Sequence, residues 1–277
     1  MIAYPGRPAP GQASSGTTER PAVLVIAATD SSGGAGLTRD VRVLSDFSVD
    51  ALCVVTAVTA QSDQQVTAIE HMPPEIIRAQ IAGALQTRSI GAIKVGMLGT
   101  CATVEAVVTG LATNGGSPPT ASIPPILPVP LIIDPVLVAS SGGILLDDAG
   151  RTALLERLLP LATLVTPNLP EVAALLGEPV VADETALIQQ GLRLLQHGGR
   201  AVLLKGGHGG GDEAVDLLIG SNGAVVRISS PRVAGSSRGT GCALASAIAA
   251  GLASGVSLPT ACREAKEYVM RMLVPLS

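Results

Sequence analysis

The chain has 277 residues, of which 47% are hydrophobic, so it is long and apolar enough to bury one substantial core. Aromatic residues make up only 1% of it, which argues against sites that stack nucleic-acid bases or sugars on aromatic rings. The formal net charge is -4 and the lysines and arginines form no cluster, so we expect no nucleic-acid partner.

The N-terminal segment differs in composition from the rest of the chain. It is rich in proline, glycine, serine and threonine and lacks the apolar core of a secretory signal. We therefore expect a disordered tail over residues 1–20 and a single domain over residues 21–277. No apolar run is long and uninterrupted enough to span a bilayer, so we expect no membrane partner. The four cysteines follow neither CxxC nor metal-ligand spacing, which is typical of a reduced cytoplasmic protein.

From Ala22 onward, segments typical of strands alternate with segments typical of helices. Residues 22–28 form a continuous apolar run, as expected for a strand buried on both faces. Further strands are predicted at residues 51–60, 92–98, 131–138, 163–168 and 201–207, and helices at residues 36–47, 73–86, 152–159, 171–176 and after residue 241. This alternation implies crossover connections and a three-layer α/β/α sandwich with a mostly parallel central sheet.

Clusters of polar residues and glycines follow the predicted strands. Open α/β sheets bind ligands at the C-terminal ends of their strands, so we expect these clusters to meet at one edge and form a site. They are TDSSGGAG (29–36), TAQS (59–62), GML (96–98), DPV (134–136), TPNLPE (166–171) and KGGH (205–208). The proline-rich stretch at residues 114–130 is instead expected to be an exposed connection.

The TPNLPE segment places an amide and a carboxylate three residues apart. This spacing is typical of a helix start in which Asn168 is the N-cap and Glu171 closes a capping box. The same pair suits a Mg2+ site, because Mg2+ keeps several waters and needs only one or two protein oxygens. Taken alone, the segment favours the capping box.

Two charged residues in or near the clusters each have an ordinary and a functional interpretation. Lys205 ends a predicted strand, where it could meet a phosphate as a point charge or be an ordinary surface lysine. Asp40 lies one turn into the helix after the first cluster, where it could be a solvated residue or a ligand contact. The local sequence leaves both interpretations open.

The segment GTGC, residues 239–242, opens the last predicted helical region. Gly239 and Gly241 flank Thr240, so successive backbone N–H groups can point into one concavity at a helix N-terminus, which suits an oxyanion or phosphate. The same field is expected to lower the pKa of Cys242 and favour its thiolate. Such a thiolate could act as a base towards a hydroxyl or as a nucleophile, although most free cysteines are buried and inert.

Seven segments in a fixed order carry a resemblance that none of them carries alone. They are IAATDSSGGAGLTRD, VVTAVTAQ, IKVGML, LIIDPVLVASSG, LVTPNLPEVAALLG, AVLLKGGH and RGTGCALASAIAAGL. Together, from about Val23 to about Tyr268, they resemble the hydroxymethylpyrimidine/phosphomethylpyrimidine kinases of thiamine biosynthesis, which belong to the ribokinase-like superfamily.

The resemblance implies that the γ-phosphoryl group of ATP is transferred to the hydroxymethyl group of 4-amino-5-hydroxymethyl-2-methylpyrimidine. In many members a second transfer to the monophosphate follows. Matched by motif, Asp40 and Gln61 contact the pyrimidine and Met97 lines its pocket. An amide such as that of Gln61 suits the aminopyrimidine edge because it can donate and accept hydrogen bonds at once. We also expect the protein to be a homodimer.

The phosphate side of the site follows from the same resemblance. Asn168 and Glu171 form an N-x-x-E element near Mg2+ and the phosphates, Asp134 lies close by, and Lys205 falls where the family approaches ATP. The glycine turn at residues 239–241 forms the anion hole for the transferred phosphoryl group. ATP and Mg2+ are therefore the expected cofactors.

Cys242 matches the position at which most of the superfamily carries an aspartate general base and this family carries cysteine. The surroundings depart from the family pattern: residues 237–238 are Ser-Arg instead of Thr-His, Ala243 replaces Thr, and Ala28 replaces Gly. Arg238 adds positive charge near the phosphates, which either favours the monophosphate step or replaces a nonessential contact.

Three alternatives are carried forward. A pyridoxal or pyridoxine kinase would use the same superfamily site on another ring. A non-catalytic pyrimidine-binding sensor would keep the pocket without turnover. A cysteine hydrolase would pair Cys242 with His71, His197 or His208, but it leaves Lys205 and the glycine turns unexplained.

Overall fold

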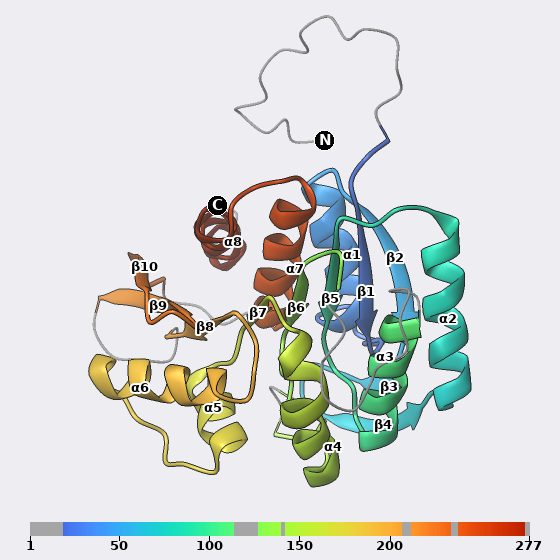
Figure 1. Cartoon of the computed structure of the whole chain (residues 1–277), viewed down its shortest axis with the longest axis horizontal. Helices are drawn as coiled ribbons and strands as arrows, with labels where there is room; N and C mark the ends of the chain where they lie inside the picture. The colour runs from blue at the N-terminus through green and yellow to red at the C-terminus, as the bar shows by residue number, and fades with distance from the viewer. Residues whose placement is uncertain (1–18, 114–126, 140–141, 207–211, 234–237, 275–277) are drawn as a thin grey trace, which may run out of the picture.

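The computed structural model describes residues 19–113, 127–139, 142–206, 212–233 and 238–274 (Figure 1). The predicted tail at residues 1–20 lies outside the described residues except for its last two. Most of the proline-rich connection predicted at residues 114–130 and the end of the KGGH cluster, including His208, also lie outside them.

The main sheet has eight strands. They are β1 (Ala22–Ala27), β2 (Asp50–Val55), β5 (Ala92–Val95), β6 (Leu131–Ile133), β7 (Leu164–Val165), β8 (Ala201–Lys205), β9 (Glu213–Gly220) and β10 (Val225–Pro231). Their order is β10-β9-β8-β7-β6-β5-β1-β2. All neighbours from β2 to β8 pair in parallel, whereas β8, β9 and β10 pair antiparallel. The predicted mostly parallel sheet is confirmed, although the sequence interpretation did not identify β9 and β10.

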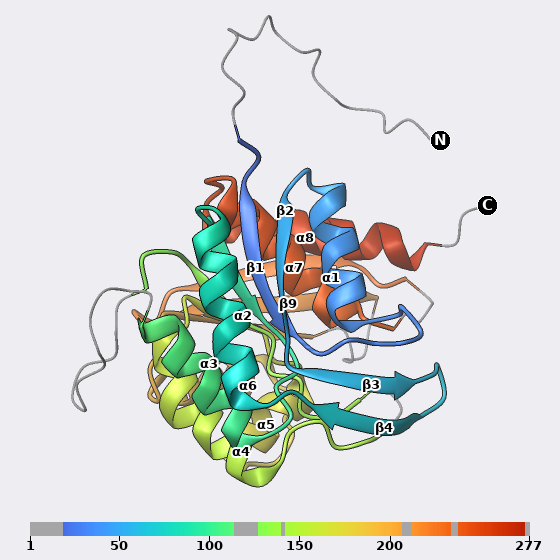
Figure 2. The ribbon, with the colours of Figure 1, turned by 90° about the vertical axis from the view of Figure 1, so that its right-hand side faces the viewer.

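A two-stranded hairpin stands apart from the main sheet. The predicted strand at residues 51–60 is divided at Thr56, so that β2 stays in the sheet and β3 (Ala57–Gln61) pairs antiparallel with β4 (Val66–His71). Figure 2 shows this β3–β4 hairpin extending sideways from the carboxyl ends of β1 and β2. Five residues of β3 and β4 are exposed and none of β4 is buried, so the apolar continuity that marks core strands is missing there, and β4 was not predicted.

Within the described residues, eight α-helices cover the two faces of the sheet. Their bounds are α1 (Gly36–Asp46), α2 (Pro74–Thr87), α3 (Cys101–Thr113), α4 (Asp148–Ala153), α5 (Leu169–Leu176), α6 (Glu184–Leu195), α7 (Thr240–Ala253) and α8 (Leu258–Leu273). The helix predicted at residues 152–159 is displaced: α4 ends at Ala153 and passes into a π-helical turn and a short 3-10 turn, where Pro160 cannot donate a helical hydrogen bond. None of the helices in the described ranges has both the length and the apolar character to cross a membrane.

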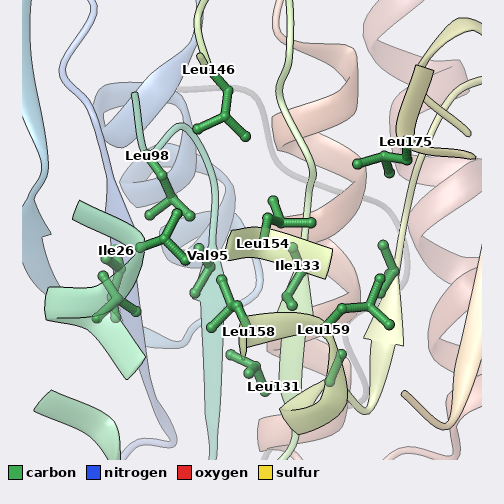
Figure 3. Packing of buried hydrophobic residues seen from close by; sticks show 14 of the residues in the cluster. Ile26, Val95, Leu98, Leu131, Ile133, Leu146, Leu154, Leu158, Leu159 and Leu175 are labelled. Atoms are coloured by element: carbon green, nitrogen blue, oxygen red, sulfur yellow. The ribbon is translucent and has the colours of Figure 1, made fainter. Parts of the chain in front are cut away.

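Two apolar clusters make the three layers. In β1, Leu24 and Ile26 point to one face and Val23 and Val25 to the other, because successive strand side chains alternate. The first cluster packs against α2 to α6, and Figure 3 shows part of it around Leu158 and Ile133. The second packs against α1, α7 and α8. Both faces are therefore covered, and the carboxyl edge of the parallel strands is left to form a site.

Candidate functional site

Three of the predicted strand-end clusters and the GTGC segment meet at the carboxyl edge of the sheet. Lys205, the last residue of β8, places its Nζ 3.0 Å from Asp134 Oδ1 and 3.8 Å from Glu171 Oε2. A Cβ added at Gly241 would lie 3.2 Å from Lys205 Nζ and 3.6 Å from Asp134 Oδ2. The first turn of α7 therefore faces Lys205 and Asp134, and Glu171 reaches the same lysine from the start of α5.

Asn168 and Glu171 form the capping box that their spacing favoured. The Asn168 side-chain oxygen accepts from Glu171 N at 2.8 Å, and Glu171 Oε2 accepts from Asn168 N at 2.7 Å. A bridge between Asn168 and Lys205 holds the start of α5 against the end of β8. The capping box therefore orients the Glu171 carboxylate towards Lys205. Glu171 thus caps the helix and also contributes a charged group to the site.

The three charged groups of this cluster perturb one another. Burial alone would raise the pKa of Asp134, but the nearby Lys205 and Lys94 ammonium groups outweigh it and hold that pKa below its usual value. Burial raises the pKa of Glu171 despite the opposing effect of Lys205. Burial alone would lower the pKa of Lys205, yet Asp134 and Glu171 raise it above its usual value. Asp134 and Lys205 are therefore both charged at neutral pH.

The donor set fits a Mg2+ ion. Within the described residues, no three His, Cys, Asp or Glu side chains are grouped so that they could hold a metal alone. Asp134 and Glu171 nevertheless bring carboxylate oxygens to the same lysine, and Mg2+ is commonly held by one or two carboxylates together with water and phosphate oxygens. The arrangement fits a metal that arrives with a nucleotide.

The Gly239–Gly241 turn opens α7 without a side-chain cap. Gly239 is the N-cap with a φ of 73°, and a Cβ there would come within 2.2 Å of the Gly34 carbonyl oxygen, so this close approach requires glycine. Gly239 has no side chain to bond the first N–H groups of α7, so a bound anion can accept hydrogen bonds from these donors. The turn has the features of an anion hole.

Cys242 follows this turn, and its protonation differs from the prediction. Burial raises the pKa of the Cys242 thiol to about 11, although the Lys94 ammonium and the backbone N–H of Gly36 act in the opposite direction. The expectation of a lowered pKa was therefore wrong, because it counted the helix field and omitted desolvation. The resting side chain is a neutral thiol at the N-termini of both α1 and α7.

A buried ion pair lies beneath the thiol. Lys94 Nζ is 2.8 Å from Asp40 Oδ2, Ser246 Oγ donates to Asp40 Oδ1 at 2.8 Å, and both charged side chains have 0% exposure. Burial alone would lower the pKa of Lys94, but Asp40, Cys242 and Asp134 raise it, so the ammonium remains charged. Ser246 is one helical turn beyond Cys242, so the pair is placed under the same face of α7.

Asp40 therefore does not lie where the resemblance implied. Its two oxygens are engaged by Lys94 and Ser246, and with no exposed surface the carboxylate does not reach a bound ring. A direct contact between Asp40 and the pyrimidine does not fit this geometry. Lys94 is the residue that sequence reasoning missed, and a cation within the otherwise apolar strand AIKV was the available signal.

Gln61 and Met97 lie beside the β1–α1 turn, which contains the first strand-end cluster. Gln61 ends β3, and its backbone exchanges two hydrogen bonds with Ser31 Oγ, at 2.8 and 2.9 Å. Met97 is buried in a small apolar cluster with Ala57 of β3 and Leu145. The hairpin and Met97 thus adjoin each other beside the β1–α1 turn, where a neutral ring could be bound.

The sequence of this chain is similar to that of known kinases. The family model for phosphomethylpyrimidine kinase matches residues 30–275. A hydroxymethylpyrimidine/phosphomethylpyrimidine kinase from Rhizobium meliloti is 40% identical over 247 residues, covering 89% of this chain and 88% of that protein.

Solved structures show the same fold. A phosphomethylpyrimidine kinase from Clostridium difficile superposes with a TM-score of 0.76 at 31% identity, covering 91% of this chain and 99% of the other. An ADP complex of Bacillus subtilis pyridoxal kinase gives a TM-score of 0.80 at 26% identity, covering 94% and 95%. The predicted ribokinase-like α/β fold is confirmed.

Proposed function

The chain belongs to the phosphomethylpyrimidine kinase family, and from this premise we propose how its strand-end site works. The site transfers the γ-phosphoryl group of ATP to the hydroxymethyl oxygen of 4-amino-5-hydroxymethyl-2-methylpyrimidine, and a second group to the monophosphate, in thiamine biosynthesis. The observation that carries this proposal is that the first turn of α7 faces Lys205 and Asp134 directly, with Cys242 next in the chain.

The phosphate side needs charge stabilisation more than covalent chemistry. Phosphoryl transfer spreads negative charge over the transferred group, so fixed positive groups aimed at it lower the barrier. The N–H groups of residues 239–241 and the Lys205 ammonium supply them from two sides. Asp134 and Glu171 would hold Mg2+, which neutralises phosphate charge when bound. ATP bound at this edge thus has its γ-phosphate between Lys205 and the anion hole.

Cys242 serves as the proton acceptor, but only as the thiolate. The O–H bond of the substrate breaks, its proton moves to the Cys242 sulfur, its oxygen bonds to the γ-phosphorus, and ADP leaves. With a pKa of about 11, the thiolate makes up only about one part in 10⁴ at pH 7. The Lys94 ammonium and the Gly36 N–H stabilise that thiolate, so the buried pair tunes the base without touching the substrate.

The ring lies between the hairpin and Met97. The Gln61 amide can donate to and accept from an aminopyrimidine edge, and Met97 provides an apolar surface for the ring. Asp40 does not take part as a ring contact; it holds Lys94 in place. We place the reaction in the cytoplasm, where ATP is available, and propose a homodimer as the working form.

One incubation tests the proposal. Purified protein is supplied with Mg-ATP and the pyrimidine alcohol, and mono- and diphosphate are followed by mass spectrometry, with pyridoxal as the competing alcohol and Cys242→Ala as the catalytic control. We expect both pyrimidine phosphates and little pyridoxal phosphate. A clear preference for pyridoxal would overturn the substrate assignment, and tight pyrimidine binding without ATP consumption would identify a sensor instead.

A further inference from the structure

Arg238 directly precedes the glycine turn at residues 239–241, here called the anion turn, and its guanidinium links this turn to two other segments. Nη2 lies 3.2 Å from Asp30 Oδ2 in the β1–α1 turn, and Nη1 donates to Ser32 Oγ at 2.9 Å in the same turn. The same Nη1 also donates to the Ser62 carbonyl at 2.9 Å and to Asp63 Oδ1 at 2.8 Å, at the tip of the β3–β4 hairpin. The side chain is only 16% exposed although its partner Asp63 is 83% exposed.

These contacts neutralise the positive charge of Arg238, which the sequence comparison with the family had suggested would lie near the phosphates. Two carboxylates, Asp30 and Asp63, face one guanidinium, so Arg238 is paired with protein groups in this structure. Its planar fork can reach two segments at once, which the point charge of a lysine cannot do to the same extent. The geometry favours a contact within the protein over an additional phosphate ligand.

The inner anchor of this bridge is preformed. Asp30 is 5% exposed, and its oxygens also accept from Ser32 N, Ser32 Oγ and Ala35 N at 2.8 to 2.9 Å. Removing Arg238 would therefore leave Asp30 with hydrogen-bond partners, and the β1–α1 turn would keep its shape. The segment that depends on Arg238 is the hairpin tip.

Within the described residues, the hairpin tip has few other attachments to the rest of the chain. The hairpin lies outside the main sheet (Figure 2). At its base Thr29 N donates to the Ala57 carbonyl, and midway along β3 the Thr59 hydroxyl donates to the Thr29 carbonyl. Near the tip, Ser31 Oγ holds the Gln61 backbone, and Arg238 holds the next two residues, Ser62 and Asp63. A segment with few buried contacts opens locally at low free-energy cost, so each of these contacts matters.

We propose that Arg238 is a positioning residue that fastens the hairpin tip, and with it Gln61, to the anion turn. Through this bridge the part of the site that binds the ring and the part that holds the phosphoryl group share one rigid frame. The consequence for ring binding rests on the proposed function, whereas the consequence for the hairpin does not.

The first experiment measures the hairpin without any substrate. Amide hydrogen exchange is followed in peptides covering residues 57–71 of the full chain, for wild type, Arg238→Gln and Asp63→Asn. Arg42→Gln removes an exposed arginine of α1 and is the matched control. We expect faster exchange of the hairpin in Arg238→Gln, a smaller increase in Asp63→Asn and no change in Arg42→Gln. Unchanged exchange in Arg238→Gln would overturn the proposal.

Steady-state kinetics of the same variants then separates the two sides of the site. We expect the KM for the pyrimidine to rise about tenfold in Arg238→Gln, the KM for ATP to change less than about threefold, and Arg238→Lys to recover part of the loss. A larger rise in the KM for ATP would assign Arg238 to the phosphates and overturn the proposal. If the wild type shows no kinase activity, the proposed function fails, and hairpin exchange alone decides the role of Arg238.

Discussion

Two lysine–aspartate pairs lie in different environments of the same sheet. Lys94 and Asp40 are 2.8 Å apart with no exposed surface, whereas Lys205 and Asp134 are 3.0 Å apart at the strand ends, with 15% of the lysine side chain exposed. Lys94 lies within β5 and points to the α1 and α7 side; Lys205 is the last residue of β8. The lysine inside a strand is therefore enclosed by protein, whereas the lysine at a strand end is partly exposed to solvent.

The position of each lysine–aspartate pair in the sheet determines what the pair can do. An enclosed pair has only its partners to interact with, so it acts through stability and through the field on Cys242. A pair at the sheet edge lies beside the α7 N-terminus, where we propose that Lys205 exchanges part of its interaction with Asp134 for a phosphate. Variants that affect one pair and spare the other test this contrast.

The largest effect is expected at Cys242, which adjoins the buried pair and the anion turn. Cys242→Ala should lower kcat by roughly 10²- to 10⁴-fold, the range for loss of a general base, with little change in ATP or pyrimidine binding. Steady-state rates of both proteins provide the measurement, and a kcat of Cys242→Ala near that of wild type would remove the base assignment.

The pH dependence of the wild type tests the same thiol. Since the pKa of Cys242 is about 11, its thiolate fraction grows with pH, so kcat should rise about tenfold per pH unit from pH 7 to 9. Pre-steady-state or steady-state rates across this range provide the measurement.

The next effect is on folding and concerns the buried pair. Lys94→Met leaves Asp40 as an unpaired buried carboxylate, so the free energy of unfolding should fall by about 3–5 kcal/mol in urea denaturation. Lys94→Met combined with Asp40→Leu should recover much of that loss, because no buried charge then lacks a partner. An equally large loss in Lys205→Met would contradict the contrast between the two pairs.

The pair at the sheet edge should give the reverse pattern. Lys205→Met removes a cation facing the transferred phosphate, so kcat/KM for ATP should fall about 10²- to 10³-fold. The thermal midpoint should change less than in Lys94→Met, because the Lys205 side chain is 15% exposed and the buried Asp134 keeps the Thr166 hydroxyl and the field of Lys94. Calorimetry and kinetics on the same preparation, with Arg42→Gln as the surface control, separate the two effects. Full activity in Lys205→Met would remove this lysine from the phosphate site.

The smallest effect is expected away from both pairs, at the hairpin. Gln61→Ala removes an amide that can bond the ring, which should raise the KM for the pyrimidine by about tenfold and leave kcat and the KM for ATP within about twofold. Its backbone bonds to Ser31 are kept in the variant, so the hairpin stays in place. An unchanged KM for the pyrimidine would exclude Gln61 from the ring contacts.

Sequence patterns predicted the parallel core and the cluster at its edge with few errors. The run AVLVIAA and the strand-end glycines indicated β1 and the turn after it, and the spacing of Asn168 and Glu171 predicted the capping box that the structure contains. These features depend on neighbouring residues alone, so local pattern was sufficient. The strands β4, β9 and β10 were missed. β4 and β10 are largely exposed and lack a continuous apolar signal, and in β9 the charged Asp216 interrupts the apolar run.

The protonation and the partners of the site residues depended on contacts distant in sequence. Asp40 and Lys94 are 54 positions apart, and Arg238 is 175 positions from Asp63, so no local spacing could reveal these pairs. The pKa of Cys242 is set mainly by how many atoms exclude water from its sulfur, a quantity that exists only in the folded chain. Sequence alone determined the family, the parallel core and the glycine turn at the start of α7. Only tertiary packing decided which charges are enclosed, which face a ligand and which bridge two segments, because electrostatic energies depend on distance and on exclusion of water.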